Sequence, residues 1–188
     1  MKKSTIIIIV IIAFLLAFFL AVVFQYNSII RLREDVKTAW AQVENQMQRR
    51  NDLIPNYVKT VKGYAVHEKE IFIEIANARS RMMGSKTLQD KLSADSAMSS
   101  AISRLMVIVE NYPALKADQN FIRLQDELAG TENRLAVERK RYNDLVNSFN
   151  KKILVFPVNL FAKMFGFEPL EFFQATEKAK TTVPSVEF

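Results

Sequence analysis

The chain opens with an apolar run that carries no charge from Ile6 to Phe24. As a helix this run would be roughly 28 Å long, because each residue adds about 1.5 Å, and that length can cross the hydrocarbon core of a bilayer. A cleaved signal peptide has a shorter apolar region that ends in small residues, whereas this run ends in bulky ones. The pattern therefore predicts a transmembrane anchor over residues 6–25, preceded by a short segment over 1–5.

Beyond the anchor, apolar residues recur every seven positions, with a second row four residues on, as on one buried helix face. The two rows contain Ile29, Val36, Val43, Tyr57 and Tyr64, and Trp40, Met47, Ile54 and Val61. Pro55 removes one backbone hydrogen bond, but both rows keep their phase beyond it. We therefore predict a continuous first helix that is kinked at Pro55 and ends near Gly63.

Two shorter helices are predicted next. Residues 67–83 have a second apolar face, and Gly84 is expected at the C′ position just beyond the end of that helix. Thr87 followed by Asp90 is typical of an N-terminal cap, which predicts a third helix that reaches about Glu110.

The fourth predicted helix is the most regular. Pro113 suits its first turn, because a helix start needs no backbone donor there. An unbroken seven-residue row follows, formed by Phe121, Leu128, Leu135, Tyr142, Phe149 and Phe156. Strict sevens indicate a left-handed supercoil against partner helices.

The predicted fold class is all-α, with an N-terminal transmembrane helix. Short connections make successive helices antiparallel, so residues 26–156 should form an up-down-up-down four-helix bundle with long first and last helices. An extended coiled-coil dimer is the alternative arrangement of the same heptads.

The chain ends in a Phe-rich tail over residues 157–188. In the predicted bundle the last helix runs back toward the membrane, so Lys151 and Lys152, just before the tail, should lie near the bilayer. The candidate membrane or partner contacts are these two lysines and three aromatic residues of the tail: Phe161, Phe165 and Phe167. The tail could cover the bundle, enter the headgroup region or join a neighbouring protomer, and we expect it to cover the bundle.

Composition excludes several classes of site. The chain has 26 basic and 20 acidic residues, a net charge of +6 that is too weak to indicate a nucleic-acid partner. It has no cysteine, and His67 is the sole histidine, so the paired histidines of a zinc protease are missing. We predict no catalytic residues, no metal site and no cofactor.

One position breaks the apolar rows. Arg50 occupies a place in the first row that is otherwise apolar. Antiparallel alignment of the first and fourth helices places it opposite Thr131 and Glu132. A buried arginine needs a carboxylate, so we predict a polar clasp in which Glu132 is buried with Arg50 and the pair sets the register of the two helices.

The chain resembles the LemA family over nearly its whole length. The resemblance is carried by "YNSIIRLREDVKTAWAQVENQMQRRNDLIPNYVKTVKGYAVHE", "NYPALKADQNFIRLQDELAGTENRLAVERKRYNDLVNSFN", "FPVNLFAKMFGF" and the final "VEF". It implies a membrane-anchored, all-helical domain without an established catalytic activity. Some family members resemble lipoproteins, with a lipidated cysteine where this chain has Phe24 and Gln25. Those relatives imply that the domain lies outside the cytoplasm.

These observations predict a non-enzymatic protein of the bacterial cell envelope, anchored once in the inner membrane. Its function would be that of a scaffold or adaptor that presents the bundle surface to other envelope proteins, with self-assembly into a homo-oligomer left open. The alternative is a lipid-interacting or membrane-remodelling protein that uses the Phe-rich tail.

Overall fold

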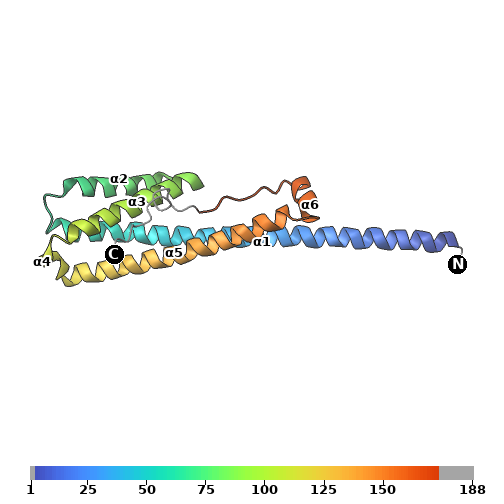
Figure 1. Ribbon diagram of the computed structural model, residues 1–188, viewed down its shortest axis with the longest axis horizontal. Helices are drawn as coiled ribbons and strands as arrows, with labels where there is room; N and C mark the ends of the chain where they lie inside the picture. Colours follow the sequence, from blue (N-terminus) through green and yellow to red (C-terminus); the bar gives the residue numbers. More distant parts are fainter. Residues whose placement is uncertain (1–2, 174–188) are drawn as a thin grey trace, which may run out of the picture. The chain divides into compact units, whose positions relative to one another are not determined.

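The computed structural model describes residues 3–173, and within that range every regular element is a helix (Figure 1). The predicted all-α class is confirmed there. The helices are α1 (Lys3–Lys62), α2 (Lys69–Gly84), α3 (Leu88–Val109), α4 (Pro113–Lys116), α5 (Gln119–Leu154) and α6 (Val158–Met164). Residues 174–188 of the predicted tail, with the final "VEF", lie outside the described residues, as do residues 1–2 of the N-terminal segment.

α1 is one continuous helix of 60 residues that includes both the apolar run and the first heptad rows. It passes through Pro55 without interruption, as predicted, and ends one residue before Gly63. Most positions of the heptad rows are buried, among them Ile29, Val43 and Val61.

The described chain forms two compact units. Unit 1 contains residues 3–41 and 140–172, and unit 2 contains residues 42–139 and Phe173. Both α1 and α5 therefore contribute to each unit.

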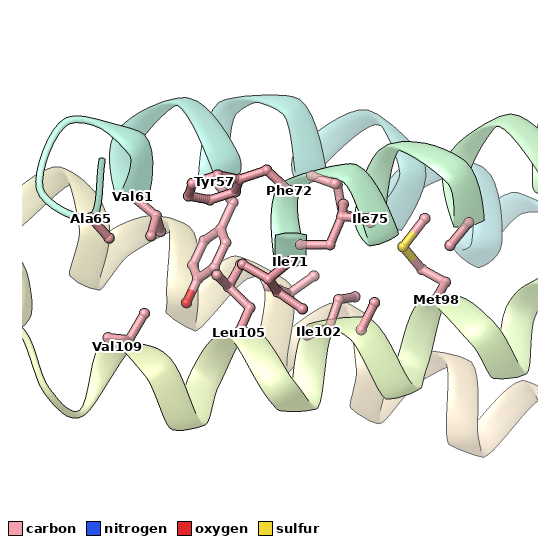
Figure 2. Close-up of a cluster of buried hydrophobic side chains, with 14 of the residues drawn as sticks. Tyr57, Val61, Ala65, Ile71, Phe72, Ile75, Met98, Ile102, Leu105 and Val109 are labelled. Atoms are coloured by element: carbon pink, nitrogen blue, oxygen red, sulfur yellow. The ribbon is translucent and has the colours of Figure 1, made fainter. Parts of the chain in front are cut away.

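Unit 2 is built around a cluster of buried apolar side chains from α1, α2, α3, α4 and α5. Figure 2 shows Tyr57 and Val61 of α1 facing α2 and α3 residues such as Ile71 and Leu105. The Tyr57 ring also lies 5.2 Å from that of Phe121, centroid to centroid. Since burying one such side chain contributes about 1.5–3 kcal/mol, this cluster is the main source of stability in unit 2.

The turn between α2 and α3 follows one prediction and contradicts another. Thr87 is the N-cap of α3, and its side chain accepts a hydrogen bond from the backbone N–H of Asp90, as predicted. Gly84 was expected at C′ but is the last residue of α2, and the cap is Ser85 in an extended conformation. No left-handed residue is used at this turn, so the glycine's conformational freedom is not needed.

The predicted fourth helix is divided. Pro113 begins a short helix, α4, and the long helix α5 starts only at Gln119. Asp118 causes this separate start, because its Oδ1 accepts the backbone N–H groups of Asn120 at 2.8 Å and Phe121 at 2.9 Å. These are donors that a helix leaves unsatisfied in its first turn.

The heptad row of α5 is buried from Phe121 to Phe149 and fails at its last member. Phe156 is 75% exposed, because α5 ends at Leu154 and the chain turns before this residue. Phe156 therefore continues the seven-residue row in the sequence but not the buried row in the structure.

Unit 1 includes α6 and the extended segment that follows it. Gly166, just after α6, has a φ of +72°. The N–H of Phe167 donates a hydrogen bond to the Ala162 carbonyl at 2.9 Å, which caps the end of the helix. Asn150 of α5 then holds the segment: its Nδ2 donates to the Leu170 carbonyl and its Oδ1 accepts the Leu170 N–H, both at 2.8 Å.

Candidate functional site: a buried charge cluster

Arg50 is the centre of a charge cluster inside unit 2, and its side chain is buried. Its Nη2 donates to Asp95 Oδ1 on α3 at 2.5 Å, and its Nη1 donates to Glu132 Oε1 on α5 at 2.9 Å. The same Nη1 donates to the Ser99 hydroxyl on α3 at 3.0 Å. One guanidinium thus joins α1 to two other helices.

A second arginine completes the cluster. Arg139 of α5 pairs with the other carboxylate oxygen of Asp95. The Arg139 guanidinium also lies over the ring of Phe173, 4.6 Å from its centroid. The cluster therefore contains two cations and two carboxylates, and such balance is what makes buried charges tolerable.

Of the predicted clasp, the structure brings Arg50 and Glu132 together but not Thr131. The Thr131 side chain is buried, yet its hydroxyl donates to the Glu127 carbonyl of its own helix at 2.8 Å. Glu132 was expected to be the buried partner, but its side chain is 32% exposed. The deeply buried carboxylate is that of Asp95, whose side chain is 3% exposed.

Sequence reasoning missed Asp95, although a signal was present. Asp95 lies in a seven-residue row with Leu88, Ile102 and Val109. It is thus a charged residue in an apolar row, which is the same criterion that identified Arg50.

Electrostatics in the cluster reflect burial. Removal from water raises the pKa of the Asp95 carboxyl, and the neighbouring Arg50 and Arg139 charges oppose that rise. Burial likewise lowers the pKa of Arg139, and Asp95 opposes this. The groups satisfy each other inside the unit, an arrangement that suits holding helices in register better than it suits acid–base chemistry on a substrate.

The other predicted residues lie apart from the cluster. His67 is exposed, in the turn between α1 and α2. Within residues 3–173, no group of three His, Asp or Glu side chains is placed to hold a metal ion.

The candidate membrane or partner contacts lie in unit 1 and differ in accessibility. Lys151 is exposed, whereas Lys152 donates to the Ser28 hydroxyl of α1 at 2.5 Å. Phe161 is half-buried, and Phe165 is exposed. Phe167 is buried against Phe149 and Tyr26, so it is not available as a contact residue.

The apolar N-terminal part of α1 has the opposite character to the cluster. Its most apolar 18-residue window has no buried residue, and α1 is long and apolar enough to cross a membrane. α3 also passes that test of length and composition, but its apolar face is part of the unit 2 cluster.

The fold and the site together define an all-helical protein with an exposed apolar N-terminal helix and a charge cluster that joins three helices. Residues 39–188 match the model of the LemA family, and the chain belongs to that family. The resemblance seen in the sequence is thereby confirmed.

Curated relatives include magnetosome proteins. Magnetosome protein MamQ 1 of Paramagnetospirillum magneticum is 28% identical over 89% of this chain and 71% of its own length. Magnetosome protein MamQ of Magnetospirillum gryphiswaldense is 27% identical over 90% of this chain and 72% of its own length. Protein LemA of Metamycoplasma hominis is 26% identical over 90% of this chain and 78% of its own length.

Proposed function

We propose that this chain is a non-enzymatic scaffold or adaptor of the cell envelope, anchored in the membrane by α1. The observation that carries the proposal is the Arg50–Asp95 pair. Its charged groups bind each other and so join α1 to α3 inside unit 2. We further propose that the long helices and the α2–α3 pair form an antiparallel four-helix bundle, with unit 2 as the surface offered to other proteins.

Exposed apolar side chains support a partner surface on unit 2. Val107 on α3 and Val137 on α5 are both well exposed. A photo-crosslinking residue at either position of the full chain, activated in living cells, should capture a small set of envelope proteins or a second copy of the chain. Arg49, an exposed residue of α1, is the control position. Capture at 107 and 137 no different from capture at 49 would contradict the scaffold proposal.

We propose a single crossing of the inner membrane, with the helical domain outside the cytoplasm. The support is the likeness to family members that resemble lipoproteins. A reporter fused after Phe188 should show extracytoplasmic activity. Strong cytoplasmic activity from an intact fusion would show that the domain has the opposite orientation.

A lipid-interacting function is the second candidate, and one observation favours it. α6 and the turn before it expose large apolar side chains, including Phe156 and Met164. Such side chains in a segment that follows the membrane-side end of α5 suit contact with a bilayer.

A further inference from the structure

We propose that α6 and the turn before it form a wedge, residues 154–164, that inserts beside α1 into the acyl chains of the leaflet from which α1 emerges. The proposal rests on the proposed membrane anchor and gives the lipid-interacting candidate a defined site. All the contacts that support it lie within unit 1.

Two ring contacts set the depth of the wedge along α1. The Phe161 ring of α6 lies 6.2 Å from the ring of Phe18, and the Phe165 ring lies 5.0 Å from that of Tyr26, between centroids. Phe18 is six residues inside the end of the apolar run at Phe24, which is about 9 Å along a helix. If α1 spans the bilayer, Phe161 is therefore held inside the hydrocarbon region, while Phe165 lies near its boundary.

The side chains of the wedge are divided between protein and surroundings. Val158 and Ala162, one turn apart, are buried within unit 1. Leu160 and Met164, also one turn apart, are 61% and 68% exposed. The turn before α6 adds three further exposed apolar side chains, Leu154, Val155 and Phe156. The free face of α6 is thus apolar at Leu160 and Met164 and also includes the exposed Lys163.

Acyl chains are the occupant that this free face fits. An exposed apolar patch in water is costly, but at the level of Phe18 the medium around α1 is hydrocarbon. Lys151 and Lys163 are exposed nearby, and their long stems allow the ammonium groups to reach phosphate headgroups. Aromatic residues at the boundary, such as Tyr26, are common at that level of a bilayer.

Site-directed spin labelling of the full chain in vesicles tests the wedge. The chain has no cysteine, so each variant Leu160→Cys, Met164→Cys, Phe14→Cys and Val107→Cys carries a single label. Phe14 lies in the apolar run and reports on the anchor. Val107 is 70% exposed, as accessible as Met164, and is the matched control in unit 2.

The wedge predicts that labels at 160 and 164 collide with oxygen several-fold more often, relative to a water-soluble nickel chelate, than the label at 107 does. Their ratio should approach that at 14. A hydrocarbon signal at 14 with a water signal at 160 and 164 would overturn the wedge and leave the anchor intact. A water signal at 14 would overturn both. Labels at 160 and 164 could instead be shielded from both reagents and show spin–spin broadening that disappears when unlabelled chain is added. That result would assign the face to a second copy of the chain and reject the wedge.

Discussion

The two units of this protein place polar and apolar groups in opposite ways. Unit 2 buries the Arg50–Asp95 ion pair beneath a surface with scattered apolar residues. Unit 1 attaches its last segment through neutral groups, such as the Asn150 amide and the Tyr142 hydroxyl, and leaves apolar side chains of α6 exposed. In unit 1 the described ion pairs, such as Lys140–Asp144, are exposed.

The difference suits the two environments that we propose for this chain. A buried ion pair costs desolvation energy but limits how helices can align, which is useful where a defined protein surface is needed. Exposed apolar groups are costly in water but favourable in lipid, which is useful beside a membrane anchor. Substitutions in the two units should therefore differ in the stability that they cost.

The largest expected effect is that of Arg50→Ala. It leaves Asp95 buried without its main partner, and breaking a buried pair in this way costs about 3–5 kcal/mol of unfolding free energy. Arg49→Ala at an exposed position should stay within about 0.5 kcal/mol. Glu132→Ala should cost about 1 kcal/mol, since its partly exposed carboxylate retains water. Denaturant unfolding of the full chain in micelles, followed by circular dichroism, measures all three.

The double variant Arg50→Met with Asp95→Leu tests whether the two residues act as a pair, in the same unfolding measurement. Apolar replacement of a whole buried pair is often neutral or stabilising, so the double variant should be more stable than either single variant. Equal or greater loss in the double variant would show that the two residues do not act as a pair.

In unit 1, Asn150→Ala should release the extended segment that follows α6. It removes two hydrogen bonds to Leu170, and we expect a cost of about 1–3 kcal/mol. Asn147→Ala, at an exposed position of the same helix, is the control. Trp40 is the sole tryptophan and packs against Tyr142, so its fluorescence reports the unfolding of unit 1. Unchanged hydrogen exchange at the Leu170 amide would argue against this role of Asn150.

A matched pair of glycines gives a smaller effect. Gly166→Ala places a side chain at φ +72 and should cost about 1–2 kcal/mol, even though the space for the new Cβ is open. Gly84→Ala has the same open space but ordinary helical backbone, so it should be neutral or stabilising. Similar losses at both positions would mean that backbone conformation is not the cause.

The smallest effect concerns acid stability. The backbone N–H of Phe121 and then the Tyr64 hydroxyl hold the pKa of Asp118 below its usual value. The resulting stability is complete above the unfolded pKa of about 3.9 and is lost as pH falls through the lower folded pKa. Asp118→Asn should make the loss of stability at low pH smaller. The raised pKa of Asp95 gives stability a pH dependence of opposite sign, and that contribution is the same in the variant. Melting temperatures of both proteins between pH 7 and 3 test this, and identical curves would contradict it.

Heptad rows predicted most of the helical core because burial repeats with the helix period, as it does from Phe121 to Phe149. The same logic indicated Arg50 as a buried charge. It failed where local hydrogen bonds decide: the Asp118 cap starts α5 after a separate α4, and the end of α5 at Leu154 turns Phe156 outward. Asp95 was not predicted because its partners, Arg50 and Arg139, come from other helices, and a charged residue in α3 without them is ordinarily a solvated one.

The environments proposed for the two units both depend on α1 holding this helical protein in a membrane. The direct measurement is alkaline carbonate extraction of cell membranes that contain the full chain, with a variant lacking residues 6–24 as control. We expect the full chain to stay with the membrane pellet until detergent is added, while the variant is released into the supernatant. Release of the intact full chain by carbonate alone would contradict it.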